Sequence, residues 1–587
     1  MARGAALPAL RGVLTIVLNL TIAIPALAQL RQETGVSKET GSNGNIPQLS
    51  DGDGAIVPPD DQAAVSQMGW APKAPKHAVL SVRQALPGAP WFRVTQGSRE
   101  VLSGTAAAAS SRWGLFFYVA DISAVDSSGE YEVQIGDAAP ARFEVRRDVY
   151  TSVRGLETNG SRPLYGLRQI LGGYFGRQRC STDRCVPGRH ADESALPEYE
   201  IRVINGTATE VPLGTHRDVR GGWHDATSTD KETAHEAKAV MNLSYAMELA
   251  QDNDARAALL EEIRWGAKYL LQIQNADGSF PLSVKDVRWY VPNDLPRHLR
   301  VNVDAGVVAH CTLALAAASS ATASQDAQLS AQLLAAARKG WAYVAAHPTG
   351  FLSPLYEPNA SWRGSAGNVL GAAVELARRT GEAQFEEFID ARILEGTFRN
   401  GLWVKSDGSW PGQLGWDQDE GSQTLLALLR YYPIASAGVQ ARIRTLCDLW
   451  RAHWNIEPAY SVQPALINNY FGGNGHLLLM ARAMLLMGET LSDGTITASG
   501  AREYDWLVGS NPFCRSFVQG LGGEMGAVPF NQPPELMLGA VLPGVLDMDG
   551  NLTVKAKDHP WAVGEATIDT SSALPHVLML LDRAYVR

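Results

Sequence analysis

Two different hydrophobic patterns divide the chain into a β-rich part and a helical part. Over residues 61–147, short runs alternate apolar and polar residues, and turn sequences such as PGAP and DSSG separate the runs. Alternation with a period of two is typical of strands that bury one face. We therefore predict a small all-β sandwich domain over these residues. The runs are AVLSV (78–82), WFRV (91–94), GLFFYVADI (114–122), EYEVQI (130–135) and ARFEV (141–145).

Residues 148–587 show the period of helices instead. Apolar residues recur at i, i+3 and i+4, and Ala-rich segments alternate with loops rich in Gly, Pro and Trp. We see neither a strand-rich block nor a strict repeat, so a regular solenoid is not expected. About a dozen such helices predict an all-α toroid of helical hairpins, with the functional site on long loops at one end. The helical segments are 234–250, 257–274, 304–318, 326–346, 366–379, 422–432, 438–453, 474–489 and 499–508.

Residues 1–28 have the pattern of an export signal. Two arginines precede the apolar run VLTIVLNLTIAIPALA, which ends in Ala-Leu-Ala, and we expect cleavage before Gln29. The alternative is a membrane anchor, which needs about 20 apolar residues, whereas Asn19 and Pro25 interrupt this shorter run. No later stretch reads as apolar enough to span a bilayer. We therefore expect a secreted or periplasmic protein that has no membrane contact after cleavage.

Composition narrows the class of partner. Residues 29–60 are rich in Gly, Ser, Asp and Pro and predict a flexible linker. The remainder reads as globular, because 45% of the residues are hydrophobic and only 19% are charged. A formal charge of −10 argues against nucleic acid as a partner, since its recognition depends on Lys and Arg at the phosphates. The sequence does not indicate an oligomeric state.

The five cysteines do not indicate cysteine chemistry. Cys180 and Cys185 have four residues between them in RCSTDRC, and export permits a small-loop disulfide there. A metal knuckle would need a second Cys or His pair at the right spacing, and we find none. Cys311, Cys447 and Cys514 lie in apolar surroundings and are expected to be buried thiols.

The densest group of acidic residues follows a Gly-Gly-Trp sequence, in GGWHDATSTDKETAHE. Asp225, Asp230, Glu232 and Glu236 lie there within a dozen residues, and Glu565 follows far downstream in VGEATID. A glycosidase needs one carboxylic acid to protonate a leaving oxygen and one carboxylate to activate water. We interpret Asp225 and Glu565 as that pair, brought together by a fold that closes on itself.

Two of these acids also have a structural interpretation. Residues 229–232, Thr-Asp-Lys-Glu, read as a capping box with Thr at the N-cap and Glu at N3. Asp230 would then lie in the first helical turn, where negative charge is favoured without any catalytic role. His235 and Glu236 are expected on the outer or lateral face of that helix. Asp225 precedes the helix by several residues and is not an obvious cap.

Glu565 has a competing explanation of the same kind. It opens a predicted helix that runs into ATIDTSSALPHVLMLLDRAY, where the helix dipole alone would favour a carboxylate. A general acid instead needs a raised pKa, and Asp569, one turn on, would supply the necessary repulsion. Pro575 would bend a helix at an interior position, so we expect the helix to restart there.

Aromatic residues cluster in the predicted loops, where they suit a carbohydrate cleft because sugar rings stack on aromatic faces. The alternative is that these side chains plug the ends of the barrel. The loop aromatics are Trp223, Trp289, Tyr290, Trp362, Trp403, Trp410, Trp416, Tyr470, Phe471 and Trp561.

Several segments together resemble glycoside hydrolase family nine, the cellulase-type inverting enzymes. The resemblance runs from about residue 65 to the end, with the motifs in the family's order. It begins in SQMGWAPKAPKHAVL (66–80), which resembles the first strand of the immunoglobulin-like domain that precedes many members. The family's Gly-Gly-Trp-His/Tyr-Asp-Ala signature is resembled by DVRGGWHDA (218–226). Its penultimate helix pair and the following loop are resembled by two segments together, YFGGNGHLLLMARAM (470–484) and EYDWLVGSNPFCRSFVQGLG (503–522). Its Asn-Glu-x-x-x-Asp-Tyr-Asn signature is resembled by GEATIDTSSAL (564–574).

The resemblance implies a mainly α fold, an (α/α)6 barrel preceded by an immunoglobulin-like β-sandwich. It also implies inversion at the anomeric carbon, with Glu565 as general acid. Asp225 matches the first Asp of the family's Asp-Ala-Gly-Asp motif, which helps to hold the water. The second Asp, the family's main base, is replaced by Ser228. Asp230 lies two residues later as a substitute, and otherwise Asp225 must work alone.

Other departures concern the substrate. The family's His-His-Arg stretch, which grips a glucose unit, is PFNQPPE (529–535) here, and the Tyr after the acid is Thr570. The resemblance therefore implies a polysaccharide or oligosaccharide other than plain cellulose, without a cofactor or an indicated metal. The rival interpretation is a glycan-binding protein that kept the cleft and lost the chemistry, which Ser228 favours. The expected substrate contacts are Trp223, His224, Trp416, Tyr470, Asn531, Trp561 and Asp569.

Overall fold

The computed structural model describes most of the chain from residue 62 to the C-terminus. The predicted export signal, linker and cleavage site lie outside the described residues. The described residues are 62–156, 161–180, 193–226, 228–285, 296–347, 366–394, 420–453, 472–523, 525–526, 529, 537–548, 551–553 and 561–587.

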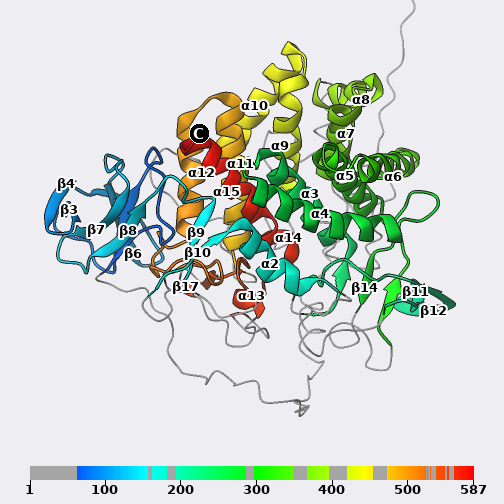
Figure 1. Ribbon diagram of the computed structural model, residues 1–587, viewed down its shortest axis with the longest axis horizontal. Helices are drawn as coiled ribbons and strands as arrows, with labels where there is room; N and C mark the ends of the chain where they lie inside the picture. Colours follow the sequence, from blue (N-terminus) through cyan, green and yellow to red (C-terminus); the bar gives the residue numbers. More distant parts are fainter. Residues whose placement is uncertain are drawn as a thin grey trace, which may run out of the picture. The chain divides into compact units, whose positions relative to one another are not determined.

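The N-terminal part is a β-sandwich of two four-stranded antiparallel sheets (Figure 1). Strands of this sandwich bury alternate residues, as in β7, where Tyr131, Val133 and Ile135 are buried, whereas β4 has no buried residue. This confirms the β-rich domain that the alternating pattern predicts. One sheet contains, in spatial order, β1 (Ala63–Ala64), β2 (His77–Val82), β6 (Leu115–Asp121) and β5 (Ala107–Arg112). The other contains β4 (Arg99–Thr105), β3 (Trp91–Gln96), β7 (Gly129–Ile135) and β8 (Ala141–Val145).

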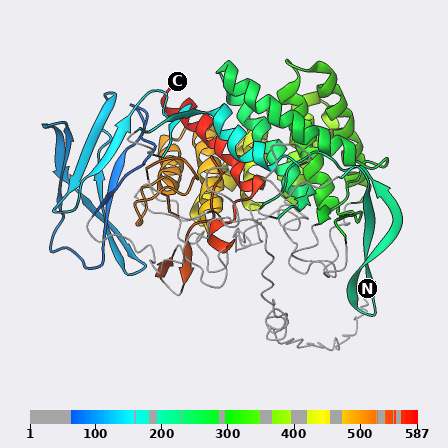
Figure 2. The ribbon, with the colours of Figure 1, turned by 60° about the horizontal axis from the view of Figure 1, so that its bottom comes forward.

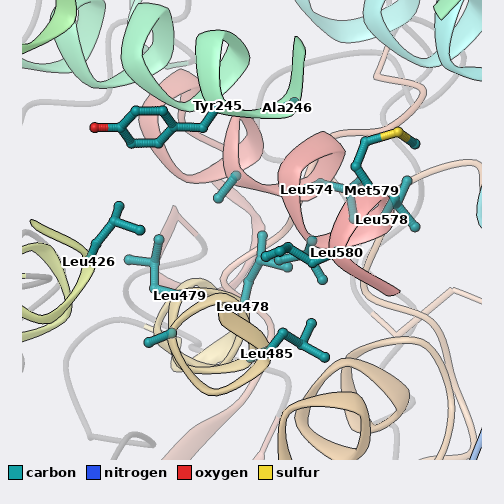
Figure 3. Close-up of a cluster of buried hydrophobic side chains, with 14 of the residues drawn as sticks. Tyr245, Ala246, Leu426, Leu478, Leu479, Leu485, Leu574, Leu578, Met579 and Leu580 are labelled. Atoms are coloured by element: carbon teal, nitrogen blue, oxygen red, sulfur yellow. The ribbon is translucent and has the colours of Figure 1, made fainter. Parts of the chain in front are cut away.

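Six helices of the remaining chain close a ring. Each packs against the next, and the last packs against the first. Apolar side chains of α3, α9, α11 and α15 form a buried cluster (Figure 3), and nearly every residue of α3 and α5 is buried. The mainly helical fold is therefore confirmed. The inner helices are α3 (Thr233–Leu249), α5 (Ala305–Thr322), α7 (Ala366–Thr380), α9 (Glu420–Tyr431), α11 (Asn474–Leu491) and α15 (Ala573–Tyr585).

A second layer of helices packs outside this ring. Most of these helices bury one stripe, as the period of 3.6 predicts for amphipathic helices, whereas α12 also buries the consecutive residues 503–507. Every predicted helical segment falls on a helix, whereas α2 and α8 were not predicted. The outer helices are α2 (Leu167–Gln178), α4 (Asn253–Ile273), α6 (Ala327–Ala346), α8 (Ala383–Leu394), α10 (Ala437–His453) and α12 (Gly494–Leu507). Shorter elements are β9 (Ser152–Arg154), β10 (Leu164–Gly166), η3 (Tyr432–Ile434), β16 (Leu546–Met548), β17 (Asn551–Thr553), α13 (Trp561–Gly564) and α14 (Ile568–Ser571).

A five-stranded sheet inside the helical region corrects the prediction that no strand-rich block occurs there. Its long hairpin lies beside the helices (Figure 2). The sequence carried a signal for this hairpin, because Asn205-Gly206 separates two alternating runs, and both residues have positive φ. The other three strands have only two or three residues, which are too few to show the alternation of apolar and polar residues that marks a strand. In spatial order the strands are β12 (Thr207–Arg217), β11 (Leu196–Ile204), β15 (His298–Arg300), β14 (Ser283–Lys285) and β13 (Lys231–Glu232).

Helix α5 corrects a second expectation. Within the described residues it is a helix long and apolar enough to cross a membrane by length and composition. However, 94% of its apolar window is buried inside the fold. Its hydropathy therefore reflects its place in the inner ring, where it packs against α3, α6 and α7.

The β-sandwich and the helices share one continuous core. The Trp70 indole nitrogen donates a hydrogen bond of 2.8 Å to Asp505 Oδ2 on α12, and the Tyr504 hydroxyl lies 3.0 Å from the Met68 sulfur. Burial raises the pKa of the Asp505 carboxyl to about 8, and the bond from Trp70 opposes the rise only in part. This interface therefore contains a carboxyl that the fold keeps protonated at neutral pH.

Asp505→Asn is expected to flatten the pH dependence of stability between about pH 4 and pH 8. The folded protein holds this carboxyl at a pKa of about 8, against about 4 in an unfolded chain. The folded state binds more protons in that window, so stability falls as pH rises through it. Asparagine keeps an acceptor for Trp70 and does not titrate. Unfolding temperatures across this range test the prediction, and equal slopes in the two proteins would contradict it.

Candidate active site

The loop that carries the predicted base begins with two glycines in a conformation that other residues avoid. Gly221 and Gly222 have φ values of +90° and +69°, which glycine adopts readily because it lacks a Cβ. A Cβ on Gly222 would also lie 2.9 Å from the Tyr269 ring. The Gly222 carbonyl accepts a hydrogen bond of 2.7 Å from the Trp265 indole nitrogen. These contacts fix the backbone just before Asp225.

Trp223 and His224 support this loop from inside the fold. The backbone nitrogen of Trp223 donates to Glu236 Oε1 at 2.6 Å, and its ring packs edge-on against Phe175 with centroids 5.6 Å apart. The backbone nitrogen of His224 donates to the Gln178 carbonyl at 2.7 Å. Both side chains are buried, and Trp223 is 0% exposed. Trp223 therefore offers no face to a sugar, and we assign it a structural part in place of the expected substrate contact.

Hydrogen bonds join the Asp225 loop to the segment that carries Glu565. The backbone nitrogen of Ile568 donates to the Asp225 carbonyl at 2.9 Å. On the same segment, the Ala566 carbonyl accepts a bond of 2.9 Å from the Tyr174 hydroxyl. The two predicted catalytic residues therefore lie on neighbouring segments, although they come from opposite parts of the helical region.

Three carboxylates lie around the Tyr174 phenol. Burial raises the pKa of Tyr174 well above its usual value, and the negative charges of Asp225, Asp569 and Glu565 raise it further. The charges of both predicted catalytic acids and of Asp569 therefore act on this one phenol. This agrees with the hydrogen bonds that join the Asp225 loop to the segment of Glu565.

The carboxyl group of Asp225 is held through one oxygen. His235 Nδ1, on the first turn of α3, makes a short contact with Asp225 Oδ1. Burial raises the pKa of Asp225, the neighbouring His235 opposes the rise, and the charges of Asp569 and Glu232 add to it. The Asp225 side chain is 12% exposed. Among the residues that the structure describes, no hydrogen-bond donor reaches its other oxygen, Oδ2.

Asp569 is a fully paired, buried carboxylate. Lys238 Nζ lies 2.9 Å from its Oδ2, and the Thr567 hydroxyl donates to its Oδ1. Burial acts to raise the pKa of Asp569, but Lys238, His235 and Thr567 together hold it below its usual range. Asp569 therefore stays ionised, and it fixes the segment that follows Glu565 onto α3.

Asp230 is placed differently from the prediction. Lys231 and Glu232 form strand β13, which pairs with β14, and α3 begins at Thr233 without a side-chain cap. The predicted capping box is therefore wrong, because strand pairing takes the residues that would have capped the helix. Asp230 Oδ2 lies 3.4 Å from Lys285 Nζ, which also binds Glu232 closely.

A buried ion-pair network anchors the same loop. Lys231 Nζ binds Glu193 closely, donates to the Gly221 carbonyl at 3.0 Å and lies 4.6 Å from the centroid of the Tyr269 ring. Arg297 Nε donates to the other oxygen of Glu193 at 2.9 Å. Removing one partner of a buried charge pair leaves the other unpaired at a cost of about 3–5 kcal/mol. The network therefore stabilises this conformation of the loop.

Glu565 does not open a helix. It lies between α13 and α14, and α14 begins three residues later at Ile568. The alternative that it only caps a helix is therefore wrong for this geometry. The long C-terminal helix α15 begins at Ala573, so the predicted restart is confirmed, with Pro575 in the first turn, where proline is tolerated. Glu565 is partly exposed.

Several predicted residues cannot be placed. Trp416, Tyr470 and Asn531 lie outside the described residues, as does Cys185, the predicted disulfide partner. Trp561 begins α13, and its side chain also lies outside them. Within the described parts of the chain, no group of three His, Cys, Asp or Glu side chains is arranged to hold a metal ion.

Helix α3 carries a polar stripe that was not predicted from the sequence. His235 and Lys238 contact Asp225 and Asp569, and Asn242 donates to the Ser572 hydroxyl at 2.8 Å. These three positions, at i, i+3 and i+7, share one face of the helix. His235 was expected on the outer or lateral face but is buried, as is Glu236. Polar residues at this spacing in an otherwise apolar helix are the sequence signal that could have indicated a buried polar face.

Models of known protein families match both the β-sandwich and the helical part of the chain. The model of glycosyl hydrolase family 9 matches residues 172–545, and that of the cellulase N-terminal ig-like domain matches residues 59–139. No curated protein sequence matches. A metagenome-derived family 9 endoglucanase superposes with a TM-score of 0.67 at 20% identity, covering 89% of this chain and 99% of its own. A thermostable endoglucanase from Alicyclobacillus acidocaldarius superposes with a TM-score of 0.65 at 21% identity, and the match covers 89% of this chain and 100% of that protein. AaCel9A in complex with cellobiose-like isofagomine superposes with a TM-score of 0.64 at 20% identity, and the match covers 89% of this chain and 100% of that protein.

Proposed function

Because the chain belongs to glycosyl hydrolase family 9, a family of glycosidases, we propose that it is an inverting glycosidase with Glu565 as general acid and Asp225 as base. The observation that carries the proposal is the hydrogen bond from the Ile568 backbone to the Asp225 carbonyl. It brings together two acidic segments that lie far apart in the sequence. The match to the family model confirms the family resemblance that the motifs indicated, whereas the roles of these two residues are our proposal.

The proposed reaction is a single displacement. The oxygen of a water molecule bonds to the anomeric carbon while one of its protons passes to Asp225 Oδ2. The glycosidic bond breaks, its electron pair stays on the leaving oxygen, and that oxygen takes the proton of Glu565. The acid ends ionised and the base protonated, and exchange with solvent restores both. Inversion follows because the water attacks the face opposite the leaving group.

Two observations favour Asp225 over Asp230 as the base. The Asp225 side chain is 12% exposed, against 6% for Asp230. Asp230 faces the ammonium group of Lys285 at 3.4 Å, and this ion pair engages the carboxylate. Ser228, at the position of the family's second Asp, accepts a hydrogen bond from the Asp230 backbone at 3.4 Å and cannot act as a carboxylate.

We propose a β-linked glycan as the substrate class. Endoglucanases and a complex with cellobiose-like isofagomine are among the similar structures, and cellulose is β-linked. The stretch 529–535 and Thr570 depart from the residues that the resemblance implies for glucose recognition. We therefore propose a β-linked oligosaccharide or polysaccharide other than plain cellulose, hydrolysed outside the cytoplasm after export.

Product release by the mature chain tests the proposal. Neutral, amino-sugar and acidic β-glycans are incubated with the protein, and both reducing ends and binding are measured. We expect new reducing ends from at least one class. Binding without any release would instead favour the rival, a glycan-binding protein that kept the cleft and lost the base with the second Asp.

A further inference from the structure

We infer that His235 is a positioning residue for the base: it holds the Asp225 carboxylate through Oδ1 and leaves Oδ2 for the attacking water, so that Asp225 can act as base although Ser228 stands at the second Asp position. This inference rests on the proposed function. It goes beyond it by giving a specific task to a residue outside the acidic pair. It also explains how one aspartate can serve as base without its usual partner.

The position of His235 suits this task. It lies in the first turn of α3, which begins at Thr233, and its side chain is 4% exposed, against 12% for Asp225. The imidazole therefore lies deeper than the carboxylate. A donor beneath the carboxylate fixes its orientation without occupying the side from which water arrives.

The surroundings of Asp225 make a donor necessary. The titratable groups that interact with it are His235 and Glu236 from α3, Asp569 from α14 and Glu232 from β13, with Tyr174 from α2 beside it. Three of these five carry a carboxyl group, and burial keeps that of Glu236 at a raised pKa of about 8. Burial and two neighbouring carboxylates therefore favour the protonated form of Asp225, in which it cannot accept a proton from water.

The two neighbouring carboxylates already have their own cations. Lys238 pairs with Asp569, and Lys285 pairs with Glu232. His235 is the group in direct contact with the base itself. A hydrogen bond to the charged form of a carboxylate favours that form. His235 thus keeps Asp225 available as a base at a pH where burial alone would protonate it.

The test compares His235→Ala with His235→Asn, on whichever β-glycan the wild-type protein hydrolyses. His235→Ala removes the donor, so kcat should fall by about 10²-fold with KM little changed. The pKa of Asp225 should rise, and the acidic limb of the kcat/KM profile should move to higher pH by about one unit. His235→Asn places an amide nitrogen near the position of Nδ1, so it should recover most of the rate.

His298→Gln is the matched control. His298 is a second buried histidine, on β15, and its Nε2 lies 2.6 Å from Glu210 Oε2. Its replacement should lower the unfolding temperature by a similar amount and leave the acidic limb where it was. Unfolding temperatures of all variants show whether each is folded. If His235→Ala does not fold, the Asn variant carries the test, with a smaller shift in the same direction.

The outcomes distinguish a failure of the inference about His235 from a failure of the proposed function. Wild-type hydrolysis with an acidic limb that neither His235 variant moves would overturn the inference and leave the proposed function intact. An equal shift in His298→Gln would also overturn it. A wild-type protein that hydrolyses no glycan and does not bind a cellobiose-like isofagomine would overturn the proposed function and the inference with it.

Discussion

Asp225→Asn is expected to lower kcat/KM by about 10³-fold or more, with little effect on KM. The amide has nearly the same shape as the carboxylate but cannot accept a proton from water. Because burial raises the pKa of Asp225, the ionised form is unfavourable in the fold. The variant should therefore be at least as stable as the wild type at neutral pH. Steady-state kinetics and calorimetry on the same samples measure both effects.

Asp230→Asn is the matched control for that prediction. It removes a carboxylate from the same loop, but one that faces Lys285 at 3.4 Å, whereas no donor among the described residues reaches Asp225 Oδ2. We expect less than about a 10-fold loss of kcat/KM, together with some loss of stability at the buried ion pair. If Asp230→Asn is the more damaging of the two changes, Asp230 is the base and Asp225 only helps to hold the water.

Glu565→Gln is expected to show a loss of activity that depends on the leaving group. A sugar or an unsubstituted phenol needs a proton as it departs, so kcat should fall by about 10³-fold. A strongly acidic phenol, such as dinitrophenol, leaves without protonation, and its β-glycosides should lose less than about 10-fold. Rates on the two kinds of aryl glycoside measure the difference directly.

The same substrates separate the acid from the base. Asp225→Asn should lose activity equally on both, because activation of water is needed whatever the leaving group is. An equal loss in Glu565→Gln on both substrates would show that Glu565 is not the general acid. It would then have to act in binding or in holding the segment before α14 in place.

The motifs predicted the pairing of distant segments better than they predicted local structure. Gly221-Gly222 before Asp225, and Glu565 with Asp569 near the end, indicated one site, and the structure brings these segments together. The inner ring was predictable for a physical reason. A helix that is buried on all faces is apolar all round, and α5 is almost continuously apolar.

Other features depend on contacts that no local pattern encodes. Residues 229–232 read as a capping box, but Lys231 and Glu232 pair with β14, so tertiary contacts overrode a sound local signal. His235 was expected on the outer or lateral face, because the sequence does not show that α3 is an inner helix. The pairing of Asp230 with Lys285 joins a loop residue just before β13 to a residue on β14, and spacing along the chain cannot predict it.

The anomeric configuration of the first product tests the central claim most directly. Proton NMR can follow hydrolysis of a β-linked substrate by the wild-type protein before mutarotation mixes the anomers. A water molecule activated by Asp225, on the face opposite Glu565, should give the α-anomer first. Initial release of the β-anomer would mean retention through a covalent intermediate, and would contradict the assignment of Asp225 as a base.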